Sequence, residues 1–178
     1  EAPIVLKAES KNQLYTVAYD PLDGSSNIDC NAPIGTIFSI SPNEKSEILL
    51  DGNRIVVAGY ILYGPSTELV LSVNNTVDRF VLSANKKYLH VGTIRLNGKK
   101  KIYSINEANS TAWNSDIKNY INSYKANGTK YTARYIGSMV GDVHRTLLYG
   151  GMFCYPADKK NPNGKLRVLY EAFPMAKI

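Results

Sequence analysis

The hydrophobic pattern of this 178-residue chain changes near residue 98, and that change limits the folds open to it. Before residue 98, short runs rich in Val, Ile, Leu, Thr and Tyr alternate with turn residues, which is typical of strands. After it, apolar residues recur with the spacing of a helix face. The sequence therefore predicts an α/β (or α+β) chain with a sheet-rich part over residues 1–98 and an α/β part over residues 99–178.

The expected elements follow from these two patterns. The predicted strands are Pro3–Ala8, Leu14–Tyr19, Ile34–Ile40, Arg54–Tyr63, Thr67–Val73, Arg79–Leu82, Tyr88–Leu96, Met152–Tyr155 and Leu166–Tyr170. A polar loop is expected over Ser41–Ser46, and Asn74-Asn75 and Asn97-Gly98 are expected to form turns. One helix is predicted from the apolar face made by Trp113, Ile117, Tyr120, Ile121 and Tyr124, with its end at Asn127-Gly128. A second is predicted to begin after Ser138 and to stop at Gly150-Gly151.

Residues 20–29, Asp-Pro-Leu-Asp-Gly-Ser-Ser-Asn-Ile-Asp, say more about chemistry than any other stretch. Asp20 and Asp23 lie on a turn set by Pro21 and Gly24, and two serine hydroxyls follow. Carboxylate oxygens suit Mg²⁺, which proteins usually hold with one or two carboxylates plus substrate phosphate. Successive N–H groups in a glycine turn form a concavity for an anion. Metal ligands beside an anion site are the combination that phosphate-ester hydrolysis requires.

Two other interpretations of this turn must be weighed. Acidic glycine turns are common surface features, and composition alone does not separate that interpretation from a functional one. A calcium EF-hand fits poorly, because its acidic ligands recur at alternate positions and end in a Glu that is missing here. The β-prone run Leu14–Tyr19 favours function, since it places Asp20 and Asp23 at the end of a buried strand, where open α/β sheets carry ligand sites.

The Asp-Pro-Leu-Asp-Gly-Ser turn is similar to the signature of the magnesium-dependent, lithium-sensitive phosphomonoesterases, and the run Tyr19–Ile40 resembles the fructose-1,6-bisphosphatase family in particular. Further motifs match that family in its own order: Val57–Tyr60, Lys101–Glu107, Ala133–Val140, Asp142–Leu147, Asn163–Arg167 and Leu169–Glu171. The resemblance implies a layered α-β-α-β-α fold. Because the family's enzymes are about twice as long, the chain is expected to be their central portion: the second half of the first domain and the first half of the second.

The resemblance also implies a metal site. Its ligands would be the side chains of Asp20, Asp23 and Glu171 with the carbonyl of Leu22, and Glu171 is expected at a strand end. The expected ion is Mg²⁺, with Mn²⁺ or Zn²⁺ as substitutes. Asp20, Asp23 and Glu171 are therefore also the expected catalytic residues.

Substrate contacts are implied for both ends of a sugar bisphosphate. The phosphate that is hydrolysed would be held by Gly24, Ser25 and Ser26. The sugar and its 6-phosphate would be held by Asn106, Tyr135, Gly137, Ser138, Met139, Tyr155 and Lys165. Arg134 matches the arginine that reaches this phosphate from a neighbouring subunit, so a homodimer or homotetramer is expected.

The implied activity is hydrolysis of the 1-phosphate of D-fructose 1,6-bisphosphate by a metal-activated water, a step of gluconeogenesis. Two alternatives stay open: a sedoheptulose-1,7-bisphosphatase, which shares the acidic turn, and a catalytically inactive relative that binds sugar phosphates. The second is kept because the acids that activate water in the family lie upstream of residue 1, and because Asn109 stands where many members have Tyr. The segment by itself is expected to be inactive.

Charge and composition exclude other classes. The net charge of +6 raises a nucleic-acid hypothesis, but the main basic cluster, Lys99-Lys100-Lys101, suits a solvated turn. No apolar run approaches the ~20 residues that span a bilayer. Two cysteines do not suggest a disulfide framework, so a cytoplasmic location is expected. His144 is predicted to be a structural histidine rather than a general base.

Overall fold

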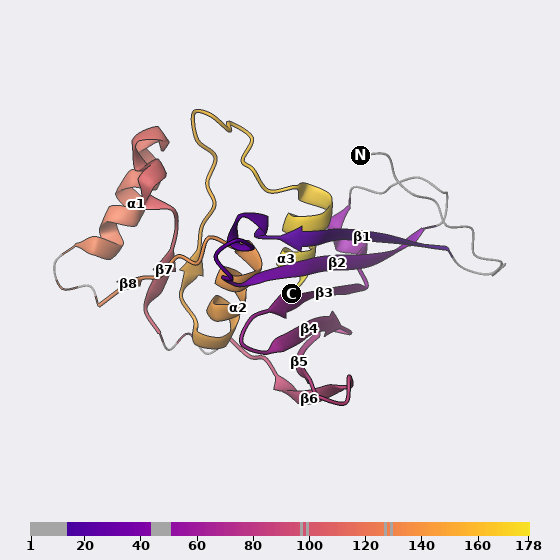
Figure 1. Cartoon of the computed structure of the whole chain (residues 1–178). Coiled ribbons are helices and arrows are strands. Elements are labelled where there is room, and N and C mark those ends of the chain that lie inside the picture. Colours follow the sequence, from indigo (N-terminus) through magenta and orange to yellow (C-terminus); the bar gives the residue numbers. More distant parts are fainter. Residues whose placement is uncertain (1–13, 44–50, 97, 99, 127, 129) are drawn as a thin grey trace.

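A computed structural model of the chain describes residues 14–43, 51–96, 98, 100–126, 128 and 130–178. Six antiparallel strands follow one another in chain order across the larger sheet, as Figure 1 shows. They are β1 (Leu14–Asp23), β2 (Ile34–Asn43), β3 (Val57–Tyr63), β4 (Thr67–Val73), β5 (Thr76–Leu82) and β6 (Tyr88–Thr93). The predicted strand Pro3–Ala8 lies outside the described residues.

The polar loop predicted at Ser41–Ser46 is wrong for its first residues, because β2 continues to Asn43. Ser41 pairs with Thr16 and Pro42 with Tyr15, beyond the last β2–β3 pair at Ile40. A proline is tolerated there because only one neighbouring strand remains to be paired.

A smaller sheet follows residue 98. Its three parallel strands, β7 (Ile102–Ser104), β8 (Thr132–Ala133) and β9 (Met152–Phe153), lie in the order β8-β7-β9. Asn114 is the N-cap of helix α1 (Ser115–Lys125), because its side chain accepts a hydrogen bond from the Ile117 backbone N–H. Helix α2 (Met139–Tyr149) ends at Gly150, as predicted. The mixed α/β class is confirmed, while the division into domains at residue 98 stays a prediction.

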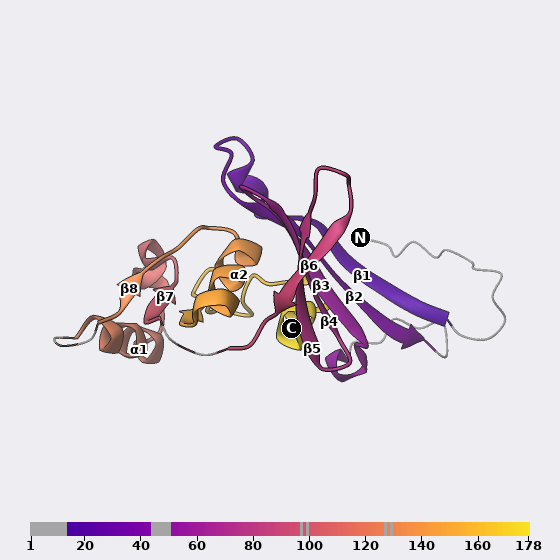
Figure 2. The same ribbon diagram turned by 90° about the horizontal axis from the view of Figure 1, so that it is seen from below.

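Helix α2 lies between the two sheets, as Figures 1 and 2 show from perpendicular directions. It contacts β2 and β3 on one side and β9 on the other. Met139 and Val140 join Ile37, Tyr60 and Val70 of the larger sheet in one apolar core. A second core forms around Tyr103, Ile105, Trp113 and Ile121 beside α1. Helix α2 contributes to the first core and follows the loop from β8. It therefore connects the two sheets through its contacts on both sides.

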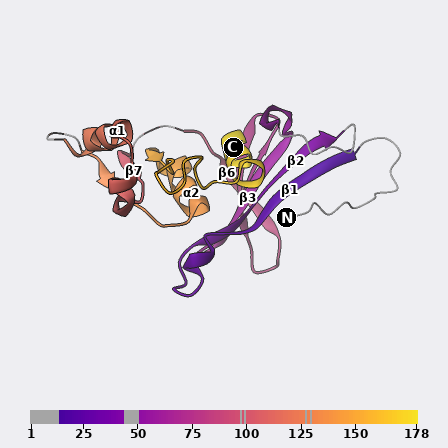
Figure 3. The same cartoon turned by 90° about the horizontal axis from the view of Figure 1, so that it is seen from above.

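The predicted strand Leu166–Tyr170 is wrong. Residues Val168–Ala172 form one π-helical turn, which continues directly into α3 (Phe173–Lys177). The Arg167 carbonyl accepts hydrogen bonds from the N–H groups of both Glu171 and Ala172. Pro174 is compatible with this helix because it sits in the first turn, where no intrahelical N–H bond is required. Helix α3 lies on the same face of the larger sheet as α2 (Figure 3). Pro174 is buried there, and such packing overrides the preference of residues 166–170 for a strand.

None of the helices in the described part of the chain has the length and apolar character needed to cross a lipid bilayer.

A buried polar network attaches α2 to the larger sheet. The Tyr60 hydroxyl lies 2.9 Å from Nδ1 of His144, and Nε2 of His144 lies 3.5 Å from Oε2 of Glu68. Arg79 donates two hydrogen bonds to the Glu68 carboxylate, which hold the pKa of that group below its usual range. Burial lowers the pKa of His144, and Arg79 adds to this while Glu68 opposes it. Burial thus favours the neutral form of His144, and its position between α2 and the larger sheet agrees with the structural role predicted for it.

We expect acid to destabilise the protein through His144. A histidine with a lowered pKa contributes stability above its ordinary value of 6.5 and loses it as the pH falls through the folded-state value. The free energy of unfolding, measured by urea titration between about pH 7.5 and about pH 5.5, should therefore fall more steeply for the wild type than for His144→Gln. The control is His90→Gln, because His90 is exposed. Equal slopes for the wild type and His144→Gln would contradict the prediction.

Candidate active site

A bulge in β1 brings the two aspartates of the acidic turn to one side of the sheet. Asp20 pairs with Ile37 and Asp23 with Gly35, so β1 uses one more residue than β2 over this interval. In a regular strand, side chains three residues apart point to opposite faces. The extra residue at Pro21-Leu22, where proline cannot donate to the ladder, turns this into a same-side arrangement. Asp20 also accepts a hydrogen bond from the Leu22 N–H at 2.9 Å.

Asp23 links the acidic turn to helix α2. Its Oδ2 accepts a hydrogen bond from the Val140 N–H at 2.7 Å and another from the Ser138 hydroxyl at 3.3 Å. The Val140 N–H belongs to the first turn of α2, where backbone donors lack intrahelical partners. Burial nevertheless raises the pKa of Asp23, and these hydrogen bonds oppose that effect only partly. The carboxylate therefore caps a helix from another element while it stays close to the other acidic groups.

Glu171 enters the same place from the π-helical turn. It is 2% exposed, and its two oxygens accept hydrogen bonds from the Arg167 backbone at 2.6 Å and the Arg167 guanidinium at 2.7 Å. Burial raises the pKa of Glu171, and its hydrogen bonds with Arg167 oppose this only partly. The segment predicted as a strand is thus a helical turn. In this turn the Glu171 carboxylate lies next to the backbone of Arg167, four residues earlier.

These three acidic groups fit a divalent cation. One carboxylate oxygen from each of Asp20, Asp23 and Glu171 lies within 4.8 Å of the other two. Asp20 is 8% exposed and Glu171 2%, so this is not a solvated acidic surface. Arg167 supplies a single positive charge against three carboxyl groups, and unpaired buried charge is unfavourable. Oxygen ligands in this arrangement suit a hard cation such as Mg²⁺.

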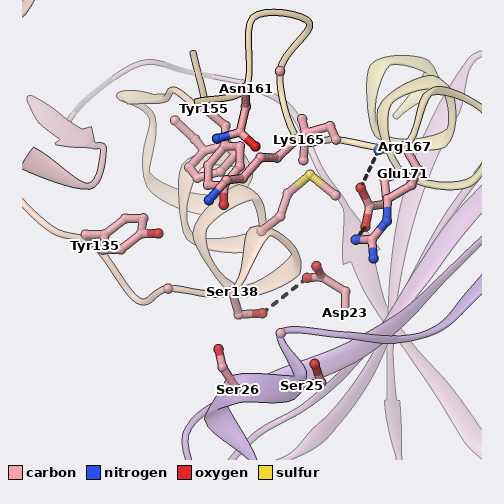
Figure 4. A pocket seen from close by; sticks show the side chains of 16 residues that line it. Asp23, Ser25, Ser26, Tyr135, Ser138, Tyr155, Asn161, Lys165, Arg167 and Glu171 are labelled. Atoms are coloured by element: carbon pink, nitrogen blue, oxygen red, sulfur yellow. Dashed lines mark hydrogen bonds and ion pairs between the residues drawn. The ribbon is translucent and has the colours of Figure 1, made fainter. Parts of the chain in front are cut away.

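A cavity of about 560 Å³ opens beside the acidic groups, within the size range of small-molecule sites. Figure 4 shows Ser25, Ser26 and Asp23 along one wall, with Tyr155, Asn161 and Lys165 facing them. Tyr135 and Glu171 lie at opposite sides of the cavity. Its wall therefore comes from β1, the turn after it, the start of α2 and the segments that follow β8 and β9.

Most of the predicted site residues meet in this cavity. Those that line it are Asp23, Gly24, Ser25, Ser26, Tyr135, Gly137, Ser138, Met139, Tyr155, Lys165 and Glu171. Four do not: Asp20, which belongs to the acidic group, Asn106, whose side chain accepts a hydrogen bond from the Ala108 N–H, and Leu22 and Arg134, which are exposed. The ligand roles of all these residues stay predictions.

Asn27 ties the segment after the glycine turn to the loop of residues 135–138. Its side-chain amide donates to the Pro33 carbonyl at 3.2 Å and to the Ile136 carbonyl at 3.4 Å. Gly24, with φ of +78°, lies so close to Ser138 that a methyl group there would be 2.6 Å from its hydroxyl. The glycine turn and the loop of residues 135–138 thus form one wall.

Several lining residues escaped the sequence analysis: Phe153, Asn161, Gly164, Leu166 and Arg167. Arg167 is the most informative of these residues, because its guanidinium forms an ion pair with Glu171 of the acidic group. A signal for it was present, since Arg167 closes the motif Asn163–Arg167 that also supplies Lys165. Residues four apart lie next to each other in a helical turn, so Arg167 can pair with Glu171 there. Because a strand was predicted for this segment, the pairing was not expected.

Comparison with known proteins gives the same relationship over nearly the whole chain. Residues 1–93 match the family model described as "Fructose-1-6-bisphosphatase, N-terminal domain", and residues 96–178 match the corresponding C-terminal domain. The chain is 53% identical to a class 1 fructose-1,6-bisphosphatase of Sulfurihydrogenibium sp., over 97% of this chain and 54% of the relative. It is 51% identical to a cytosolic fructose-1,6-bisphosphatase of Brassica napus, over 94% of this chain and 52% of the relative.

Solved structures agree with the sequence comparison. The holo form of Leishmania major fructose-1,6-bisphosphatase superposes with a TM-score of 0.86 and 49% sequence identity, over 91% of this chain and 55% of that one. The chain spans about half the length of the curated relatives it matches.

Proposed function

Because this chain belongs to the fructose-1,6-bisphosphatase family, we propose that the protein containing it hydrolyses the 1-phosphate of D-fructose 1,6-bisphosphate, giving fructose 6-phosphate and phosphate. This proposal is supported by one observation: the same cavity is lined by Asp23 and Glu171 of the acidic group and, elsewhere along its wall, by Tyr135, Tyr155 and Lys165. Such a cavity can hold a molecule with two separated anionic ends.

At the reacting end, Asp20, Asp23 and Glu171 would hold Mg²⁺, or Mn²⁺ or Zn²⁺ in its place, with the Leu22 carbonyl as a further ligand. The bound cation would neutralise the phosphoryl oxygens and the leaving oxygen during attack by water. The hydroxyls of Ser25 and Ser26 face the cavity and would donate to the phosphate. The helix cap that Asp23 forms with Val140 fixes the orientation of its carboxylate before substrate binds.

At the other end, Asn106, Tyr135 and Tyr155 would donate hydrogen bonds to the 6-phosphate, and Lys165 would contact the sugar and phosphate oxygens. Desolvation raises the pKa of Tyr135 above its ordinary value of 10, and the hydroxyl is protonated at neutral pH in either case. Met139 and the backbone at Gly137-Ser138 would contact the sugar ring.

We further propose a homo-oligomer in which Arg134 serves the neighbouring subunit. Arg134 is exposed and does not line the cavity of its own chain, although Tyr135 beside it does. A guanidinium can bind phosphate through two parallel hydrogen bonds. A cytosolic location is proposed because relatives from Brassica napus and Solanum tuberosum bear cytosolic names.

The test is phosphate release by the full-length protein with Mg²⁺ from two substrates in parallel. We expect kcat/KM for fructose 1,6-bisphosphate to exceed that for sedoheptulose 1,7-bisphosphate by about tenfold or more, and activity to disappear with a chelator. Fructose 6-phosphate is the matched control, because it lacks the reacting phosphate. Equal or better turnover of the seven-carbon substrate would contradict the substrate assignment, and binding of the sugar bisphosphate without turnover would indicate an inactive relative.

A further inference from the structure

We propose that Asp142 is a positioning residue, which sets the place of the loop of residues 135–138 and through it the affinity for the sugar phosphate. This inference rests on the proposed function. Asp142 belongs to the motif Asp142–Leu147, to which the sequence analysis assigned no role in binding or catalysis, and it is fully buried, at 0% exposure. A buried carboxylate without a strong set of donors would be unstable, so its partners are informative.

The partners of Asp142 come from three separate elements. Its Oδ2 accepts hydrogen bonds from the backbone N–H groups of Ile136 at 3.0 Å and Gly137 at 3.1 Å. Its Oδ1 accepts from the Ser104 hydroxyl of β7 at 2.6 Å and from the Arg145 guanidinium at 2.8 Å. One carboxylate thus connects the loop, the smaller sheet and helix α2.

The loop depends on this contact because it has little regular pairing of its own. Gly137 has φ of +82°, a left-handed conformation that favours glycine. The backbone N–H groups of Ile136 and Gly137 both donate to Oδ2 of Asp142. On the other side, the Ile136 carbonyl accepts from Asn27. Tyr135, Gly137 and Ser138 line the cavity. Asp142 and Asn27 therefore hold the loop from opposite sides, and its cavity-facing residues move if either hold is lost.

The acidic group lies on other elements. Asp20 and Asp23 belong to β1 and Glu171 to the π-helical turn, and none of the hydrogen bonds described for Asp142 involves them. Asp23 contacts the loop through the Ser138 hydroxyl at 3.3 Å, but its shorter hydrogen bond, at 2.7 Å, is to the Val140 N–H of α2. A displaced loop would therefore weaken contacts to the sugar phosphate in the ground state and the transition state alike, and would change the reacting end less, because the Val140 bond holds Asp23 in place. Such a loss appears in KM more than in kcat.

The testing variant is Asp142→Asn in the full-length protein. Asparagine keeps the size of the side chain and one oxygen for Ser104, Arg145 and the Ile136 N–H, which lies 3.2 Å from Oδ1 as well. Its amide N–H₂ would face the Gly137 N–H and the second contact of Ile136, where only an acceptor fits. We expect KM for fructose 1,6-bisphosphate to rise roughly tenfold or more, while kcat falls less than about threefold. Amide hydrogen exchange at Ile136 and Gly137 should become faster.

The matched control is Glu68→Gln, which changes another buried carboxylate with a guanidinium partner but leaves the cavity wall unaltered. It should lower the melting temperature without changing KM. If Asp142→Asn behaves in the same way, with unchanged KM and unchanged exchange at Ile136 and Gly137, Asp142 is only structural and the proposal is overturned.

Two further outcomes are decisive. If Asp142→Asn does not fold, exchange in the wild type decides: protected amides at Ile136 and Gly137 support the contact, and unprotected ones overturn it. If the wild type releases no phosphate from any sugar bisphosphate, the proposed function fails. The role of Asp142 in holding the loop is then judged from the exchange rates of Asp142→Asn and Glu68→Gln alone.

Discussion

Replacing Asp23 with asparagine in the full-length protein is expected to lower Mg²⁺-dependent phosphate release about a thousandfold while leaving the fold intact. The variant removes a negative charge from a group of three carboxylates whose oxygens lie within 4.8 Å of one another. Asparagine still offers a carbonyl oxygen to the Val140 N–H, so the cap of α2 is kept. The measurement is the steady-state rate over a range of Mg²⁺ concentrations, together with the melting temperature.

Asp29→Asn is the matched control, since Asp29 belongs to the same acidic stretch but is exposed and does not line the cavity. It should keep nearly the wild-type rate. A fully active Asp23→Asn protein would contradict the metal assignment. An Asp23→Asn protein that is unfolded would contradict the expectation that asparagine keeps the cap of α2.

The second large effect is expected from Gly24→Ala. Gly24 has φ of +78°, and an added methyl group would lie 2.6 Å from the Ser138 hydroxyl and 2.7 Å from its Cβ. The glycine turn and the start of α2 must then separate. A displacement of about 1 Å at a reacting centre can reduce turnover about a hundredfold, and we expect a loss of that size here.

Gly128→Ala separates the steric effect from backbone strain. Gly128 has φ of +88°, but a methyl group there would meet nothing within 4 Å. Alanine with positive φ costs about 1–2 kcal/mol at either position. Both variants should therefore lose some stability, measured by urea unfolding, and only Gly24→Ala should lose turnover as well. Similar turnover in the two variants would mean that the close approach of Gly24 to Ser138 has no functional importance.

The local sequence was sufficient for much of the fold. Alternating β-prone residues predicted β4 at its observed bounds, Thr67–Val73, because a strand with one buried face needs side chains of period two. The glycines predicted the end of α2 for a similar reason, since Gly150 has a backbone conformation that other residues adopt with strain. Helix α1 ends at Lys125, and Asn127 of the turn Asn127-Gly128 predicted for its end lies outside the described residues. These features depend on neighbours in the chain, so they can be inferred from one segment at a time.

The segment around Glu171 could not be predicted in this way. Its apolar residues favour a strand by propensity, yet packing of α3 on the larger sheet and the return of Glu171 to Arg167 select a helical turn. Arg167 was missed as a cavity residue for the same reason. Propensity is a weak preference that contacts between distant segments override.

The chemical groups of the candidate site could be identified from the residue order alone: two aspartates beside a glycine turn, a distant glutamate, and tyrosines and lysine in motifs of one family. Their meeting in one place depends on the folded arrangement of segments that are far apart in the chain. Asp20 and Asp23 share a side because β1 has a bulge, Asp23 reaches α2 across more than a hundred residues of chain, and Asp142 holds the loop from within α2. Such contacts depend on burial and hydrogen bonding between segments that are far apart in the sequence. Local patterns could therefore identify the residues but not how they are arranged.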